Sequence, residues 1–550
     1  MAINSVMQST MKKKNIIFGL IPVLFSLLLL NGCKEEIDPI VEELDFDRAF
    51  TPVGIQASIS DVTRVTLTWS AVKNTDHYTV EIWEGTDINI GSLVQSADVP
   101  VSEDVVVVYS YVLPAGDTEF SARVKAISSL TGVEESKWTA VSFRTAPENL
   151  FTGYESEMTG LNSCTVRWKP GVVATDLAFD NGTSEILYPI TSGELAAGVK
   201  SLTGVPNASY EVRLMNTTFS RGSINLVIEG DILLAPGGDL NAALDALPAG
   251  GVLLLTNGTK YGLTEPDTVT SSIKIRGLYP ENFPTIYLMT GSPIAYHMFD
   301  IGTAMTASDS LVFENVDISC YYDDAGVTKH RGVIDQEANA FIIGAIKFNN
   351  CIIRNSGRSA IRLRGFSGGQ VINNVEFNNC IMYDFAFDSH YGVLNGAATG
   401  NFINIKFRNS TVYSLRGGII NYGSGAGCQS VLVDNCTFNA VTMDASSARY
   451  FIDFGTTGNL SNGTLTISDC IFGQTSALAN GVRNNQMALS VTGSYSTSDF
   501  INVAGSIIPS TTSYAGASTS LWSNPAGGVF TFADPNFAGA ATAGDPRWKP

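Results

Sequence analysis

The chain has 550 residues, enough for three or four domains, and its hydrophobic content of 44% allows large buried cores. Only 15% of the residues are charged and glycine is abundant at 52 residues, a composition typical of short strands and turns. The formal net charge of −19 argues against nucleic acid as a partner, since that needs a cationic face, and against charge-driven attachment to an anionic membrane.

The N-terminus has the layout of an export signal. Three lysines starting at Lys12 precede an apolar run over residues 16–30, which is short for a membrane span of about 20 residues. Met11 lies directly before these lysines and is, beside Met1, a second candidate for the start. The alternative to a signal is an ordinary transmembrane anchor.

The apolar run stops at Leu30-Asn-Gly-Cys33, which resembles a bacterial lipobox. The resemblance implies that residues 1–33 form a signal peptide with a lipobox, and that Cys33 is acylated and becomes the mature N-terminus. The Lys and two Glu that follow resemble the surface-export signal of lipoproteins in glycan-degrading gut bacteria. This implies lipid anchoring on the exposed face of the outer membrane. Residues 34–50 are polar and acidic and are predicted to be a tether.

Residues 51–146 contain alternating strands at regular spacing, for example over residues 65–69 and 78–83, with turn residues between them. This pattern predicts an antiparallel β-sandwich. The segment resembles a fibronectin type III domain, because Trp69 stands where that family has its core tryptophan. Phe120 departs from the family, which usually has a tyrosine there, and this puts the corner hydrogen bond in doubt but not the fold.

Residues 147–232 resemble a second, more divergent copy of the same module. Trp168 ends a strand that parallels the first tryptophan strand, and Tyr210 restores the corner tyrosine. Such modules usually act as spacers. In the alternative, aromatic rings exposed on one face would bind sugars by stacking.

From residue 233 onward the pattern changes to that of a solenoid. A short amphipathic helix over residues 241–247 precedes apolar strands over residues 252–255 and 272–277. This opening resembles the start of pectate-lyase-like β-helices, in which a helix covers the open end of the coils. The resemblance implies an all-β chain, with one or two fibronectin type III-like sandwiches followed by a right-handed parallel β-helix over residues 233–550.

An irregular repeat supports this fold and predicts a regular corner in successive coils. Each copy contains an Asn or Asp, at spacings that fit one coil plus a loop of variable length. The side chains predicted to stack as a polar ladder are Asn315, Asn350, Asn379, Asn409, Asn435 and Asp469. The next position is cysteine in four coils, at Cys351, Cys380, Cys436 and Cys470.

The repeat also bears on the eight cysteines, which in an exported protein would usually suggest disulfides. Because four of them occupy one repeat position and Cys33 is predicted to be acylated, we expect a ladder of buried thiols instead. A zinc site is disfavoured, because the sequence has no Cys-x-x-Cys pair and no nearby pair of histidines.

The C-terminal segment contains two related sequences, Ala533-Asp-Pro-Asn-Phe537 and Gly544-Asp-Pro-Arg-Trp548. They resemble the C-terminal signature of uncharacterised surface lipoproteins from polysaccharide-utilisation systems. The resemblance implies a C-terminal capping segment, in which we expect Trp548 to pack over the last coil.

A second recurring strand follows these corners and predicts the candidate site. Its polar residues, expected to stack on one face, are Asp335, Asn395, Asn421 and Asp453, while the copy near residues 360–363 is ambiguous in register by one residue. Just upstream lie the basic residues His330, Arg331, Arg358, His390, Arg416 and Arg449. Because coils are roughly 4.8 Å apart, this stripe would match the length of a few sugar residues.

These residue types suit an acidic polysaccharide. Arginine binds the carboxylate of a uronic acid in a bidentate way, and Asp or Asn accepts sugar hydroxyls or holds calcium. In a lyase, His390, Arg358 or Arg416 would be the base that removes the proton beside the neutralised carboxylate. In the alternative, the stacked amides are ordinary solenoid ladders and the arginines are only solvated.

We therefore expect a surface lipoprotein that binds or helps to process acidic polysaccharide, with an outer-membrane glycan-uptake partner. One alternative is a polysaccharide lyase acting by β-elimination on a uronic-acid polymer, and another is a non-catalytic adhesin or structural surface protein. The chain lacks the paired Asp and Gly-His-Gly of polygalacturonases and the Arg-x-x-Pro-x-x-Arg of pectate lyases. It also has no nucleotide, haem or flavin motif, so no cofactor beyond calcium is considered.

Overall fold

The computed structural model describes residues 47–550, apart from 88–90, 103, 155, 292–296, 337–338, 365–368, 386–389, 397–399, 424–426, 457–459 and 502–506. The predicted signal peptide, Cys33 and residues 34–46 of the predicted tether lie outside the described residues. Strands dominate, and the α-helices are the short α1 (Ser192–Ala197), α2 (Leu240–Asp245) and α3 (Ser518–Leu521). Among the described residues no helix has the length and apolar character needed to span a bilayer. The predicted all-β class is confirmed.

The first β-sandwich consists of two sheets. One has the order β1 (Gln56–Ser60), β2 (Arg64–Ser70), β5 (Val106–Val112), and the other has the order β4 (Leu93–Pro100), β3 (Thr75–Glu84), β6 (Glu119–Ser128), β7 (Thr139–Arg144). Trp69 is buried as predicted, and its ring lies edge-on to Tyr78 at a centroid distance of 5.4 Å. Arg48, inside the predicted tether, already forms an ion pair with Glu134.

The second β-sandwich has its strands in the equivalent order. Its sheets are β13 (Val199–Thr203), β10 (Ser163–Trp168), β8 (Phe151–Thr152), with β9 (Met158–Gly160) also paired to β10, and β12 (Glu185–Pro189), β11 (Asp176–Asp180), β14 (Ala208–Asn216), β15 (Phe219–Ile228). The Tyr210 hydroxyl donates to the Pro206 carbonyl at 2.9 Å. This is the corner hydrogen bond that Phe120 lacks the hydroxyl to form. Two fibronectin type III-like sandwiches are therefore present.

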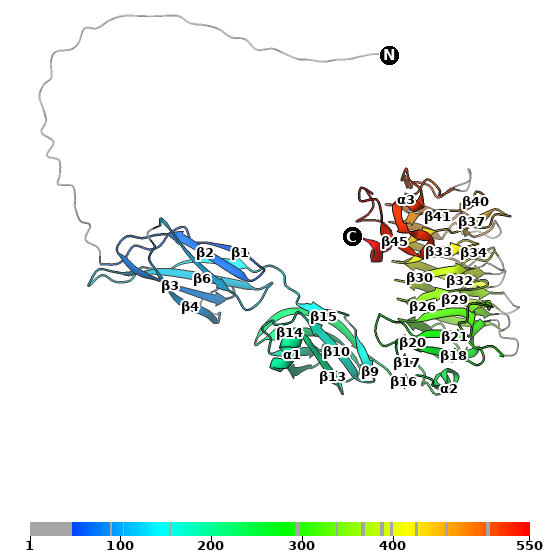
Figure 1. Cartoon of the computed structure of the whole chain (residues 1–550), viewed down its shortest axis with the longest axis horizontal. Helices are drawn as coiled ribbons and strands as arrows, with labels where there is room; N and C mark the ends of the chain where they lie inside the picture. Colours follow the sequence, from blue (N-terminus) through cyan, green and yellow to red (C-terminus); the bar gives the residue numbers. More distant parts are fainter. Residues whose placement is uncertain are drawn as a thin grey trace, which may run out of the picture. The chain divides into compact units, whose positions relative to one another are not determined.

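The remainder of the chain winds through three parallel sheets, so that successive coils contribute strands to each sheet in turn (Figure 1). The first sheet contains β16 (Ile232–Leu234), β17 (Gly251–Leu255), β20 (Ile273–Gly277), β23 (Ser310–Glu314), β26 (Phe341–Asn349), β29 (Gln370–Asn378), β32 (Gly400–Arg408), β35 (Ser430–Asp434), β38 (Thr464–Ser468) and β41 (Ala488–Thr492). The second contains β18 (Lys260–Leu263), β21 (Thr285–Leu288), β24 (Asp317–Tyr322), β27 (Ile352–Arg354), β30 (Ile381–Phe385), β33 (Thr411–Leu415), β36 (Thr437–Asn439), β39 (Ile471–Phe472), β42 (Tyr495–Ser496) and β43 (Thr512–Ser513).

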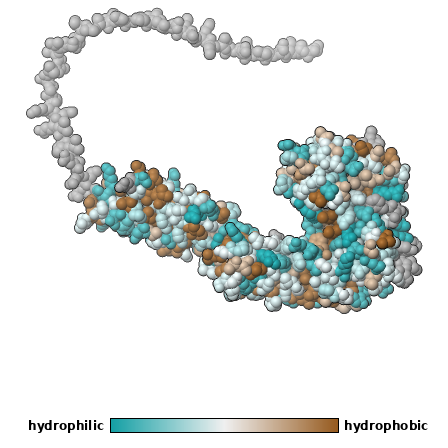
Figure 2. All heavy atoms as spheres, viewed as in Figure 1, coloured by the Kyte–Doolittle hydropathy of each residue, from teal (hydrophilic) through white to brown (hydrophobic). Residues whose placement is uncertain are grey.

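The third sheet contains β19 (Asp267–Val269), β22 (His297–Ile301), β25 (Gly332–Gln336), β28 (Ile361–Leu363), β31 (Leu394–Gly396), β34 (Ile420–Tyr422), β37 (Arg449–Asp453) and β40 (Ala479–Arg483). A final antiparallel pair, β44 (Trp522–Asn524) and β45 (Val529–Phe532), follows α3. The predicted parallel β-helix is confirmed. Hydrophilic and hydrophobic residues are interspersed on its visible face (Figure 2), and a large cluster of buried apolar side chains fills its interior.

The first coils of the solenoid are covered as the sequence predicted. Asp239 caps α2 by accepting a hydrogen bond from the Ala242 amide at 3.1 Å, and Leu240 and Leu244 are buried in the solenoid core. The second sandwich also packs here, because Leu254 of β17 belongs to the same hydrophobic cluster as the sandwich tryptophan Trp168.

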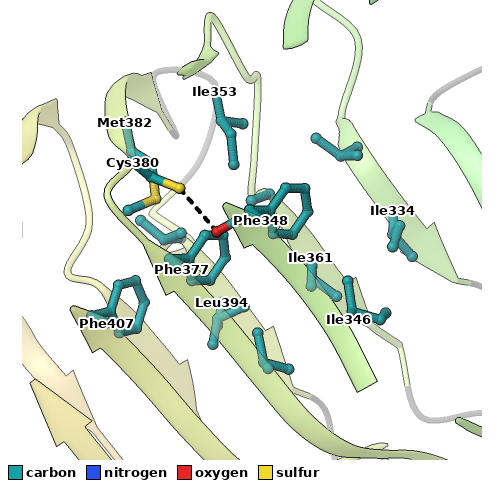
Figure 3. Close-up of a cluster of buried hydrophobic side chains, with 14 of the residues drawn as sticks. Ile334, Ile346, Phe348, Ile353, Ile361, Phe377, Cys380, Met382, Leu394 and Phe407 are labelled. Atoms are coloured by element: carbon teal, nitrogen blue, oxygen red, sulfur yellow. Dashed lines mark hydrogen bonds between the residues drawn. The ribbon is translucent and has the colours of Figure 1, made fainter. Parts of the chain in front are cut away.

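Stacked side chains fill the interior. The rings of Phe313, Phe348, Phe377 and Phe407 follow one another at centroid distances of 5.0, 5.0 and 4.9 Å. Figure 3 shows three of these rings in a row, with the Cys380 thiol donating to the Phe348 carbonyl at 3.2 Å. All seven cysteines within the described residues are buried free thiols, which confirms the predicted thiol ladder there. Burial raises the pKa of Cys320 and Cys428 to about 12, so these two thiols stay protonated and inert.

The predicted asparagine ladder is confirmed over its first three members. The Asn350 amide donates to Asn315 at 2.8 Å, and the Asn379 amide donates to Asn350 at 2.8 Å. The ladder then shifts, because Asn409 donates to Asn378 instead. All six predicted ladder residues have a left-handed backbone, with φ between 50° and 56°. Asparagine is therefore favoured at this corner for its backbone as well as for its amide.

The C-terminal segment lies beside the coils rather than over the last one, and this corrects the predicted position of Trp548 (Figure 1). The Trp548 indole donates to Thr411 of β33 at 2.7 Å, and the Arg547 guanidinium donates to the side chain of Asn379 at 2.8 Å. The buried Asp545 accepts from Thr411 at 2.7 Å. The segment is placed by polar partners on the middle coils, while Phe500 packs on Phe472 near the end of the solenoid.

Candidate functional site

The polar residues predicted to stack on the third sheet do stack, in one continuous column. The paired positions run from Asp335 through Arg362, Asn395, Asn421 and Asp453 to Arg483. Arg362 fills the coil whose register the sequence left ambiguous. The sequence prediction missed both Arg362 and Arg483. Their position in the repeat, in register with the Asp and Asn residues, could have revealed them.

Glycines precede the strands of the third sheet because the turns that enter this sheet leave no room for a side chain. A Cβ on Gly332 would collide with the Ser359 carbonyl of the next coil, and one on Gly418 would collide with the Tyr450 carbonyl. Neighbouring turns are thus packed backbone against backbone. This close packing fixes the position of Arg331 and Arg358, whose backbones are joined by a 3.0 Å hydrogen bond.

Asp335 is the first residue of the column and the most buried of its carboxylates. Its side chain is 1% exposed, accepts from Arg364 at 2.7 Å and is 3.6 Å from Arg362. Its other carboxylate oxygen, Oδ2, has no hydrogen-bond partner among the described residues. Burial raises the pKa of Asp335, an effect that Arg362 and more distant cations oppose.

Arg362 and Arg364 pair with this carboxylate, and the charges of Arg331 and Arg358 act on it from further away; we call these four residues the arginine cluster. Arg362 donates to Asn395 at 3.0 Å and to the Tyr391 hydroxyl at 3.3 Å, and its guanidinium lies 4.4 Å from the Tyr391 ring centre. Its Nη1 is buried without a hydrogen bond in the described part of the chain.

Arg358 is the least compensated member of the arginine cluster. Its guanidinium lies 5.7 Å from the Tyr391 ring, and no carboxylate among the described residues is within ion-pair distance of it. Partial burial lowers the pKa of Arg358, and the neighbouring charges of Arg331 and Arg362 lower it further. Repulsion between like charges means that an anion would be stabilised here.

Arg416 and Arg449 form a second group around Asp444, a residue that the sequence analysis did not single out. Asp444 is buried, accepts from Arg449 at 3.0 Å and lies 3.5 Å from Arg416. Burial alone would raise its pKa, but hydrogen bonds from Ser446 and Arg449 hold the pKa well below the usual value. These two arginines are therefore already paired with an anion.

His390 is exposed beside this second group, and its ring lies 5.4 Å from the Tyr391 ring. Partial burial and the charge of Arg449 lower the pKa of His390, so the imidazole is neutral at pH 7. The other predicted histidine, His330, is 2% exposed and packs edge-on against Tyr322 at 5.5 Å. It lies beneath the surface that the other candidates share.

The last two predicted residues have structural partners. Asp453 forms a two-pronged ion pair with Arg483 at 2.6 and 2.7 Å, and the Asn421 carbonyl accepts from Asn395 at 3.1 Å. Within the described residues no group of three or more His, Cys, Asp or Glu side chains is arranged to hold a metal. Asp335 and Asp453 are the carboxylates of the column, and each is paired with arginine, so calcium binding stays a prediction.

Two family models match the solenoid. One, described as Domain of unknown function (DUF4957), matches residues 259–415, and the other, described as Domain of unknown function (DUF5123), matches residues 431–548. None of the curated proteins matches the chain. Neither description names an activity, so function has to be inferred from the site.

Two solved chicken structures with fibronectin type III domains are similar to part of the chain. A two-domain segment of tenascin is 18% identical, covers 32% of this chain and 97% of its own length, and has a TM-score of 0.20. The FN1–FN3 domains of CNTN1 are 14% identical, cover 34% of this chain and 69% of their own length, and have a TM-score of 0.16.

Proposed function

We propose that this protein is a surface lipoprotein that binds an acidic polysaccharide through the arginine cluster of the third sheet. In this proposal Cys33 is acylated and the lipid holds the chain in the outer membrane of a bacterial cell. The two sandwiches act as spacers between the membrane and the solenoid, and a glycan-uptake protein of the same membrane is the partner. The polysaccharide contains uronic acid.

The observation that supports this proposal most is the partly buried guanidinium of Arg358, which has no carboxylate partner among the described residues. It lies beside Arg362 and Arg364, which already pair with the buried Asp335, in a chain whose net charge is −19. A partly buried guanidinium without a carboxylate, such as that of Arg358, is costly unless an anion pairs with it. A uronate carboxylate has the planar, two-oxygen geometry that a guanidinium binds in a bidentate way.

Binding can be tested with the soluble chain from residue 34 onward, on a panel of pectic, alginate and glycosaminoglycan polymers. Arg358→Gln should weaken binding about 10-fold, because a charge-assisted hydrogen bond contributes about 1.5–3 kcal/mol. Arg408→Gln is the matched control, since Arg408 is an exposed arginine of the first sheet. Unchanged binding in a folded Arg358→Gln variant would exclude the arginine cluster, and no binding across the panel would exclude the function.

Anchoring has its own test. Cells that express the full chain should incorporate labelled palmitate into it, and Cys33→Ala should abolish this label and release the protein from the membrane fraction. Retention of both label and membrane association in Cys33→Ala would show that Cys33 is not the lipidated residue. Protease treatment of intact cells would distinguish surface exposure from a periplasmic location.

A lyase is the second candidate, favoured by the neutral and exposed His390 next to Tyr391, which contacts the arginine cluster. In β-elimination the base takes the proton beside the carboxylate, the bond to the leaving oxygen breaks, and a double bond forms. Ultraviolet absorbance from unsaturated uronides would rise during incubation with the polymer that binds. Loss of that signal in His390→Ala with binding retained would identify the base, and a flat signal in the wild type would leave a binding protein.

A further inference from the structure

A cavity with several polar side chains in its wall lies at the N-terminal end of the third sheet, next to the residues described above. Its volume is about 420 Å³, within the usual range for small-ligand pockets. The groups that line it and matter here are Thr268, Thr270, His297, Asp300 and Thr303. None of these belongs to the stripe that the sequence predicted.

A histidine–aspartate pair forms one wall of this cavity. His297 Nε2 and Asp300 Oδ1 are 3.0 Å apart. Because a carboxylate oxygen only accepts hydrogen bonds, Nε2 is the donor in this pair. Nδ1 and the second oxygen of Asp300 have no further hydrogen bond within the described residues, and the same holds for the hydroxyls of the three threonines.

The cavity and the arginine cluster are neighbours along the third sheet, because Gln336, which follows Asp335, lines the cavity. Thr268 pairs with Asp300 across the third sheet, and Phe299 pairs with Ile334, so Asp300 lies beside Asp335 on the neighbouring coil. Adjacent parallel strands are about 4.8 Å apart, close to the length of one sugar residue. A polymer lying along the coils would therefore reach the cavity one or two sugars away from the arginine cluster.

The two ends of this surface have opposite charge. The arginine cluster is cationic, whereas the cavity has the carboxylate of Asp300, the imidazole of His297 and the hydroxyl groups of the three threonines. A second uronate in the cavity would be repelled by Asp300, by about 1 kcal/mol or more at a partly exposed site. A sugar with hydroxyl groups and no charge would satisfy the threonines and His297 without this repulsion.

We propose that the cavity is a subsite for an uncharged sugar next to the acidic one, so that the ligand is a polysaccharide in which acidic and neutral units are mixed. This proposal rests on the proposed function, since it assumes that the acidic unit binds at the arginine cluster. It adds that the best ligand carries a negative charge on only some of its sugar units, and not on every unit.

The test uses the polymer of the panel that binds, in its fully acidic form and in a partially methyl-esterified form, so that only the charge of some units differs. Wild-type protein should bind the esterified form several-fold more tightly. Asp300→Asn should bind the fully acidic form about 5-fold more tightly than the wild type does, which removes the preference. Thr270→Val should weaken binding of the esterified form about 3-fold and leave the acidic form unchanged. Thr492→Val, on an exposed threonine of β41, is the matched control.

Failure of this proposal and failure of the proposed function give different results. If the affinity ratio of the two forms is the same in wild type, Asp300→Asn and Thr270→Val, the cavity is not a subsite, while the arginine cluster can still bind. If Arg358→Gln does not weaken binding, or no polymer binds, the proposed function falls and this subsite with it. Melting curves verify that the variants fold. Asp300→Asn should fold normally, because the Asp300 side chain is 35% exposed and is bonded only to His297 among the described residues.

Discussion

At the scale of single residues, the repeated asparagine of the solenoid is explained by two requirements at once. Asn350 has a φ of 51°, which costs most side chains about 1 kcal/mol or more. Its amide also donates to Asn315 and accepts from Asn379. A residue that satisfies only one requirement should therefore be a partial replacement.

Substitutions at Asn350 separate these requirements. Asn350→Ala should lower the free energy of unfolding by about 2–3 kcal/mol, because it loses both hydrogen bonds and strains the corner. Asn350→Gly should lower it by about 1–2 kcal/mol, since glycine adopts the left-handed backbone freely. Urea denaturation measures both, with Asn373→Ala at a half-buried position of β29 as a control, expected to be nearly neutral because its side chain makes no hydrogen bond among the described residues. Equal losses for Ala and Gly would show that backbone strain plays no part.

The sequence predicted which residues share the third-sheet column but not the full set. Asp335, Asn395, Asn421 and Asp453 were found because Asp and Asn recur at one position of the strand. Arg362 was missed because a chemically different residue occupies the same position, and periodic patterns detect only similar residues. Asp444 was missed because it lies on a turn, where the repeat has no fixed length.

At the scale of elements, the cap of the solenoid contains an unfavourable carboxylate. Burial, aided by the nearby charge of Asp245, raises the pKa of Asp267 in β19 to about 6 from the usual 3.8. Between these values the folded chain binds more protons than the unfolded one. The free energy of unfolding therefore falls as pH rises through this interval, and Asp267 costs stability at neutral pH.

Asp267→Asn should flatten this part of the pH profile. We expect the variant to gain on the order of 2 kcal/mol at pH 7 relative to the wild type and to gain nothing at pH 3.5, where the wild-type carboxyl is already neutral. Urea denaturation at a series of pH values measures this, with Glu211→Gln, an exposed carboxylate of β14, as the control. A gain that does not depend on pH would point to packing rather than to charge.

The position of the C-terminal segment on the solenoid could not be predicted from the sequence. Its sequence indicated a cap, but its partners, Thr411 and Asn379, are more than a hundred residues away and gave no local signal. Trp548→Ala should lower the melting temperature, with a loss of about 2 kcal/mol for a half-buried tryptophan. Trp548→Phe keeps the ring contact with Phe530 and should lose about half of that. An unchanged melting temperature in both variants would mean that the segment does not stabilise the coils.

At the scale of the whole molecule, the sequence predicted the order of sandwiches and solenoid, because strand periodicity and the coil repeat are local properties. It did not predict that the second sandwich and the first coils share a core. Nothing in the sequence around Leu254 and Leu278 distinguishes these two residues from leucines that face the solenoid interior. Arg276 of β20 joins the same two parts. Its side chain is 1% exposed, forms a 2.6 Å ion pair with Glu229 and donates to Ser156 at 2.8 Å.

This junction predicts that the second sandwich and the first coils open together. Arg276→Met removes the buried cation but keeps most of the volume, and leaves Glu229 with Lys274 alone. Breaking a buried ion pair from one side costs about 3–5 kcal/mol. Amide hydrogen exchange should therefore accelerate in β10 of the sandwich and in β20 of the solenoid to a similar extent, with Arg408→Gln as the control. Adding Glu229→Gln should recover part of the loss, because it neutralises one of the two carboxylates, Glu229 and Glu314, that lose Arg276. Acceleration confined to β20 would show that the two parts unfold independently despite their shared core.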